Sequence, residues 1–174
     1  MKKVLLAING ITPHSSPFLY ALQYCHITLI GLCILQVIDP KRYLDLGKHL
    51  KSKVRLANRY LEDIMATAAI AEAGNHDLVH DFLQQGRENI EQAVPREYRQ
   101  EVPLSLEQRI GDTRAEILSF LESRKDIALA VYDDPYQAGI EQDSSSDELS
   151  LERDIPFRLG IPLIKPETRL PRQE

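Results

Sequence analysis

The sequence contains no tryptophan and only two cysteines in 174 residues. Cys25 and Cys33 both lie in apolar segments. So few cysteines exclude the disulfide framework on which small secreted domains depend. We therefore expect two buried free thiols in a protein of the reducing cytoplasm.

Long hydrophobic runs are also missing. Met1-Lys2-Lys3 leads into only about six apolar residues, which is shorter than the apolar core of a secretion signal. No run approaches the ~20 apolar residues that span a bilayer, so no membrane span is expected. A chain of 174 residues is long enough to bury the core of one α/β domain.

A concentrated basic patch is absent as well. The net charge is −5, and the segment from Asp133 to Asp154 holds eight acidic residues against Arg153 alone. This leaves 18 acidic and 20 basic residues for the rest of the chain, which is close to neutral. Such a balance argues against a broad nucleic-acid surface.

Five short apolar segments predict β-strands. Two are continuous runs, typical of central parallel strands that are covered on both faces. A third segment alternates apolar and polar residues, and the last is bracketed by Pro162 and Pro166, which suits an edge. The segments are Val4–Ile8, Leu29–Ile38, Leu104–Ile110, Ile127–Tyr132 and Ile161–Ile164.

The segments between these strands favour helices. The first helix should begin at Ser16-Pro17 and bury Phe18, Ala21, Leu22 and Cys25 along one stripe. Asp112 or Thr113 should cap another helix at its first turn. The predicted helices are Ser16 onward, Leu50–Ala71, Asp77–Val94 with Gly86 as a weak point, Thr113–Ser123, and a short Leu149–Arg158 interrupted at Pro156.

Strands that alternate with helices predict an α/β fold: a single domain with a five-stranded parallel sheet sandwiched by helices. We assign this domain to residues 1–166, with a helical insertion at about 77–99 before the third strand. Residues 133–148, rich in acids and serine, are expected to form a mobile loop, and 167–174 a flexible tail.

Three motifs in this order resemble the universal stress protein family. Val4–Gly10 followed by Ala21-Leu22 is similar to that family's first strand and helix, and Leu32–Pro40 to its second strand. Gly111–Leu118, which reads G-D-T-R-A-E-I-L, is similar to the family's "GDpaeeIL" turn into a helix. The resemblance implies the adenine nucleotide alpha hydrolase-like fold.

The chain departs from the family at the nucleotide site. ATP-binding members carry an acidic residue at the end of the first strand, where this chain has Asn9. They also carry a glycine-rich loop after the fourth strand, but Gly139 is the only glycine between Tyr132 and Gly160 here. The resemblance leaves Asn9, Gly10, Val37 and Gly111 as remnants of the site, and we expect a divergent member without the ATP-binding loop and without a cofactor.

These departures predict a non-catalytic regulatory or partner-binding module of the stress-response type. One alternative is an adenine-nucleotide binder, or a weak ATP hydrolase, with a remodelled phosphate loop. A second alternative is a metal-binding protein that uses His76 and His80, which lie one helical turn apart. Solvated histidines at the start of a helix are the simpler interpretation.

The sequence indicates two kinds of protein partner. The resemblance implies a homodimer in which the last strand pairs across a two-fold axis, with Ile161, Leu163 and Ile164 at the interface. A basic stretch from Lys41 to Arg55 is either a solvated helix face or a docking patch for an unidentified acidic partner.

Overall fold

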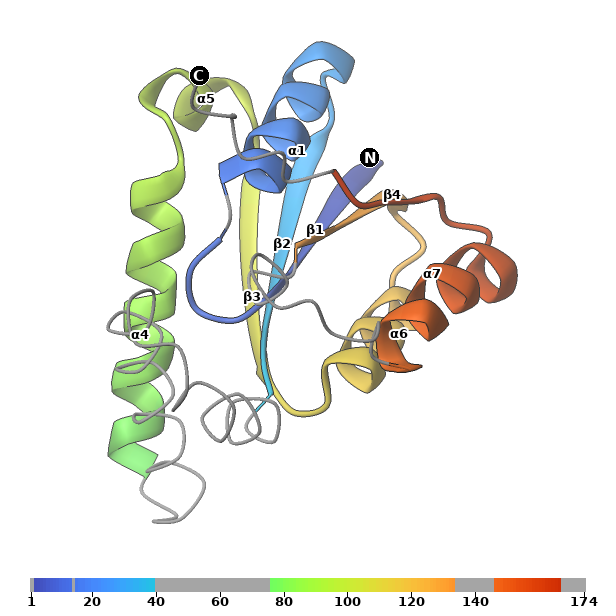
Figure 1. Cartoon of the computed structure of the whole chain (residues 1–174). Coiled ribbons are helices and arrows are strands. Elements are labelled where there is room, and N and C mark those ends of the chain that lie inside the picture. Colours follow the sequence, from blue (N-terminus) through green and yellow to red (C-terminus); the bar gives the residue numbers. More distant parts are fainter. Residues whose placement is uncertain (1, 14, 40–75, 134–145, 167–174) are drawn as a thin grey trace, which may run out of the picture.

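The computed structural model describes residues 2–13, 15–39, 76–133 and 146–166. A five-stranded sheet lies at its centre in the order β3-β2-β1-β4-β5, and every neighbouring pair is parallel. Helices α1, α4 and α5 cover one face and helices α6 and α7 the other (Figure 1). The strands are β1 Lys3–Asn9, β2 Gly31–Ile38, β3 Leu104–Ile110, β4 Ile127–Asp133 and β5 Leu163–Ile164. The predicted fold class is confirmed.

Strands β1 and β2 occupy the middle of the sheet, and their side chains are buried on both faces. Alternate side chains of β1 point to opposite sides: Val4, Leu6 and Ile8 join the core beneath α1, whereas Leu5 and Ala7 join the core beneath α6 and α7. Each fully buried leucine or isoleucine contributes about 1.5–3 kcal/mol. This two-sided burial explains why both segments read as unbroken apolar runs.

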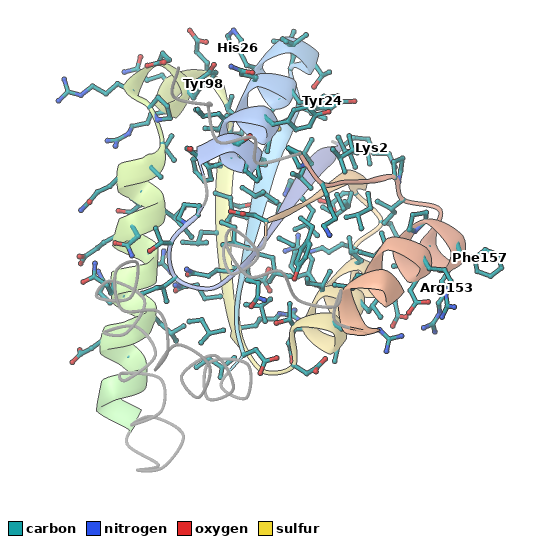
Figure 2. The ribbon with its side chains drawn as sticks, in the orientation of Figure 1. Lys2, Tyr24, His26, Tyr98, Arg153 and Phe157 are labelled. Atoms are coloured by element: carbon teal, nitrogen blue, oxygen red, sulfur yellow. The ribbon has the colours of Figure 1, made fainter. Side chains whose placement is uncertain are left out.

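Helix α1 (Ser15–Thr28) buries the predicted stripe of Phe18, Ala21, Leu22 and Cys25. The C-terminal end of α1 contacts helix α5 (Arg96–Glu101), where His26 Nδ1 lies 2.9 Å from Glu101 Oε2. The rings of His26 and Tyr98 meet edge to face with centroids 5.7 Å apart (Figure 2). Helix α5 was not predicted, because its six residues, R-E-Y-R-Q-E, carry no apolar stripe.

The end of α1 places a leucine where helices usually have glycine. The Ile30 N–H donates to the Cys25 carbonyl at 3.2 Å, which closes the helix, and Leu29 adopts the left-handed conformation with φ of 56°. The Leu29 side chain is 80% exposed, so burial in the monomer does not offset this strain. The predicted strand Leu29–Ile38 begins at Gly31 for this reason.

Leu29→Gly should stabilise the protein by about 0.5–1 kcal/mol, because the left-handed conformation costs a non-glycine residue about 1–2 kcal/mol and glycine's extra chain entropy offsets only part of that. Urea denaturation measures the change. Leu19→Gly is the matched control: it places glycine inside the same helix and should destabilise by about 1 kcal/mol. Equal losses in both variants would contradict the assignment of strain to Leu29.

Helices α6 (Thr113–Ser123) and α7 (Ser146–Leu159) cover the second face. Asp112 caps α6, since its side chain accepts from the Ala115 N–H at 2.8 Å. Helix α7 continues through Pro156, so the predicted interruption there is wrong. Pro156 lies in the last turn, and Leu151 and Ile155 hold that helix on the core.

Some of the remaining sequence predictions agree with the structure, some differ from it, and some concern residues that it does not describe. Helix α4 (His76–Ala93) forms within the predicted insertion. Residues 146–148, expected at the end of the mobile loop, belong to the first turn of α7, and Asp133 belongs to β4. The helix predicted over Leu50–Ala71, the basic stretch, residues 134–145 and the tail 167–174 lie outside the described residues.

Candidate functional site

The carboxyl ends of the parallel strands form the candidate site, because ligands of open α/β sheets bind there, where the strand order reverses. In this sheet the order reverses between β1 and β4. Asn9 ends β1 and Asp133 ends β4, in the register that pairs Ile8 with Asp133. Asp39 follows β2 directly. All three polar side chains are buried.

Asn9 lies against the start of helix α6. Its Oδ1 accepts a hydrogen bond from the Thr113 hydroxyl at 3.2 Å. Both residues are buried. The Asn9 amide nitrogen, Nδ2, has no hydrogen-bond partner among the residues that the structure describes. The structure thus joins the end of β1 to the first residue of α6 and leaves one buried donor unused.

Gln36 forms the second polar contact at this edge, on the opposite face of the sheet. Its Nε2 donates to the Gly10 carbonyl at 2.8 Å, and its Oε1 accepts from Gln108 Nε2 at 2.8 Å. Gln108 Nε2 also donates to the Leu83 carbonyl at 2.6 Å. These contacts, which we call the Gln36 network, tie β1, β2, β3 and α4 together.

Helix α4 approaches this network at Gly86. A Cβ atom at Gly86 would lie 2.7 Å from Gln36 Oε1 and 2.8 Å from Gln36 Nε2. Further along α4, Asn89 Nδ2 lies 3.3 Å from both the Ile11 carbonyl and Thr12 Oγ1, in the loop after β1. Gly86 is therefore a position at which α4 lies directly against the Gln36 network.

The other predicted remnant positions have structural roles. Gly10 has a φ of 125°, and its N–H donates to the Val37 carbonyl at 2.9 Å. The Val37 side chain is buried in the core beneath α6 and α7. The Gly111 N–H donates to the Ile38 carbonyl at 3.0 Å. These four positions share one sheet edge. Within the described part of the chain, Asn9 is the one among them whose side chain carries an unpaired polar group.

Sequence reasoning missed Gln36, Gln108 and Thr113. Gln36 is the only polar residue inside the run G-L-C-I-L-Q-V-I, and a polar residue in a buried strand needs a partner. That signal was readable. The partners of Gln36 could not be predicted from the sequence, because Gln108 and Leu83 come from distant segments.

Two titratable side chains away from this edge, Cys25 and Asp154, have shifted pKa values. Burial raises the pKa of the Cys25 thiol to about 12. Both cysteines are free and buried, as predicted. A hydrogen bond from Arg114 lowers the pKa of Asp154, and this pair joins α6 to α7.

The histidines of the metal-binding alternative and the predicted interface residues lie away from this edge. His80 is exposed on α4, and the described part of the chain holds no group of three potential metal ligands. Ile161 is buried against the second core. Leu163 and Ile164 are half-buried on β5, the edge strand beside β4.

No family model matches the chain, and a search of curated proteins finds no match either. Among solved structures, the universal stress protein UspA from Lactobacillus plantarum aligns with a TM-score of 0.50 at 14% sequence identity. The alignment covers 95% of this chain and 97% of that one. The chain has a universal-stress-protein-like fold. Across the described ranges, no helix is both long and apolar enough to cross a membrane.

Proposed function

We propose that this protein is a non-catalytic regulatory or partner-binding module of the universal stress protein type that does not bind ATP. The observation that carries the proposal is the set of side chains at the carboxyl ends of the sheet strands. There the Gln36 network and helix α4 occupy one face. Two buried acids also lie at this edge: Asp39 directly follows β2, and Asp133 ends β4. An ATP site requires room for the nucleotide and groups that offset the negative charge of its phosphates.

The electrostatics of the edge oppose a polyphosphate. A carboxylate at about 4 Å from a phosphate charge costs roughly 1–4 kcal/mol, depending on how far water screens the pair. Asp133 lies at the strand reversal, and the sequence that follows it begins with Asp134 and holds a single glycine, Gly139, before Gly160. Few glycines also mean few positions at which backbone amides can approach phosphates closely.

Isothermal titration with ATP and Mg²⁺ tests the proposal. We expect a dissociation constant weaker than ~1 mM, equivalent to about 4 kcal/mol of binding free energy. Asn9→Asp, which restores an acid at the end of β1, should leave binding equally weak, because the obstacle lies in the neighbouring acids. A micromolar constant for the wild-type protein would overturn the proposal and favour the adenine-nucleotide binder or weak hydrolase.

We place a homodimer contact at β5 within the same proposal. The Ala130 N–H donates to the carbonyl of Pro162, the residue before β5, at 2.9 Å, so that carbonyl faces β4. Successive residues of a strand direct their N–H and C=O groups to opposite sides, so the N–H and C=O of Leu163 point away from β4. An open edge of this kind favours pairing with a second copy. Two buried free thiols support a reducing, cytoplasmic setting.

A further inference from the structure

Two aliphatic side chains at the C-terminal end of α1 protrude into solvent. Ile27 lies in the last turn of the helix and is 77% exposed, and Leu29, which follows the helix, is 80% exposed. Tyr24, about one turn before Ile27, is also exposed. We call these three residues the α1 tip, which lies at the top of the molecule in Figure 1. Exposed apolar side chains that gather in one place mark contact with a protein or a membrane.

The backbone of Leu29 indicates that its side chain has a partner outside the monomer. Leu29 has a φ of 56°, the left-handed conformation that glycine adopts at little cost. Leucine is strained there, and a side chain so exposed gains too little from the monomer to offset the strain. Glycine would therefore suit the monomer better. A leucine at this position is explained if its side chain is buried against a surface that the monomer does not contain.

The nearest charged side chains beside the α1 tip on the sheet are lysines. Lys3 of β1 pairs in register with Gly31 of β2, so Lys2 lies next to the turn between α1 and β2. The Lys2 ammonium donates to the Lys125 carbonyl at 3.3 Å. This contact brings a second exposed lysine to the same end of the sheet. Figure 2 shows Tyr24 on the side of α1 that faces Lys2, whereas His26 points to α5.

The acids at this end of the molecule are balanced or lie on another face. Asp126 lies 3.5 Å from Lys3 Nζ. Helix α5 carries two arginines and two glutamates, and Glu122 lies across the sheet on α6. The buried acids of the candidate site lie at the opposite ends of the strands. The two exposed lysines beside the α1 tip therefore favour a partner with negative charge.

The size of the α1 tip favours a lipid surface over a second protein. A standard protein interface buries ~800 Å² on each partner, and two protruding aliphatic side chains supply only a small part of that area. A bilayer has no fixed shape to match, and peripheral binding depends on the apolar area inserted and on attraction to anionic lipids. Tyrosine rings are also enriched at the level of the lipid headgroups. The α1 tip and its lysines combine these three features.

We propose that the α1 tip is a membrane-docking site, at which Ile27 and Leu29 insert between lipids while Lys2 and Lys125 contact anionic headgroups. The contact is peripheral and reversible, because two side chains and two charges give only weak anchoring. The site lies at the amino ends of the strands, so the inference is independent of whether ATP binds at the carboxyl ends.

A tryptophan probe tests insertion directly, because the chain has no tryptophan of its own. The test mixes the full chain with vesicles of phosphatidylcholine that contain about 40% phosphatidylglycerol, an anionic lipid. Ile27→Trp should then emit at shorter wavelength, since the indole leaves water for the lipid interface. Phe157→Trp, at an equally exposed position on α7, is the control and should not shift. No shift for Ile27→Trp, or equal shifts for both variants, overturns the inference.

Leu29→Gly separates lost docking from lost folding. The variant removes an inserted side chain, so sedimentation with the same vesicles should show binding about tenfold weaker than that of the wild type. It also relieves the backbone, so it should unfold at a higher urea concentration than the wild type. Phe157→Ser removes an exposed apolar side chain elsewhere and should bind like the wild type. Undiminished binding by Leu29→Gly contradicts the docking site.

Paired charge reversals test the lysines. Lys2→Glu with Lys125→Glu, and Arg87→Glu with Arg153→Glu, each lower the net charge by the same amount from −5. Only the lysine pair should weaken binding to anionic vesicles about tenfold, because Arg87 and Arg153 lie on α4 and α7. Equal losses would show that overall charge governs binding and would overturn the inference. A wild-type dimer that light scattering finds lost in Leu29→Gly would assign the α1 tip to a second copy instead.

Discussion

Leu163→Asp should convert a dimer of this protein into monomers. The N–H and C=O of Leu163 face the open side of β5, so a two-fold axis at this residue lets two copies exchange both backbone hydrogen bonds. The proposed contact would bury the part of the Leu163 side chain that is exposed. An aspartate there must lose its water without gaining a partner, which costs several kcal/mol, so we expect the dimer to weaken at least a hundredfold.

Size-exclusion chromatography with light scattering measures the change at micromolar concentrations. Phe157→Asp is the matched control, since Phe157 is 87% exposed and its ring projects away from α7 into solvent (Figure 2). It introduces the same charge outside the proposed contact and should remain dimeric. A monomeric wild type, or a Leu163→Asp variant that is both folded by circular dichroism and dimeric, refutes the contact at β5.

The structure distinguishes the three residues that the sequence predicts for the interface. Ile161, Leu163 and Ile164 form one apolar segment in the sequence, but the structure separates them. Ile161 is buried in the core beneath α6 and α7, and the Leu163 side chain is half-buried against the same core. The N–H and C=O of Leu163 point away from β4. Sequence reveals that a segment is apolar, and only the register with β4 reveals which of its groups remain unpaired.

The sheet and α1 could be predicted because their signals are local. Buried strands read as apolar runs, and α1 repeats its apolar residues at helical spacing. Pro156 and α5 show the limit of local rules. Tertiary contacts of Leu151 and Ile155 keep α7 helical through a proline, and α5 folds without a stripe of its own.

The sequence predicts where the candidate site lies, but it predicts only some of the contacts within the site. The resemblance directs attention to Asn9 and Gly10 at the end of the first strand, where the described strands do reverse their order. Thr113 lies 104 residues from Asn9 in the sequence, so nothing local announces their hydrogen bond. The unpaired Nδ2 follows from that bond and is visible only in three dimensions.

Gly86→Ala should destabilise the protein, contrary to what helix propensity predicts. In an exposed helix, replacing glycine by alanine stabilises by about 1 kcal/mol. Here the added Cβ would lie 2.7 Å from Gln36 Oε1, and Gln36 is fully buried with its amide bound on both sides. Moving that amide breaks two buried hydrogen bonds worth about 1–3 kcal/mol each when left unmade, so we expect a net loss of about 1–3 kcal/mol.

A double-mutant cycle with Gln36→Ala isolates this contact. Gln36→Ala removes the amide that the new methyl group meets, so in that background Gly86→Ala should become neutral or stabilising by up to about 1 kcal/mol. Urea denaturation of the four proteins gives the coupling energy, which should exceed about 1 kcal/mol. Arg87→Ala, an exposed change at the neighbouring position of α4, should stay within about 0.5 kcal/mol of wild type. Additive effects of the two substitutions would show that α4 does not depend on the Gln36 network for its place on the sheet.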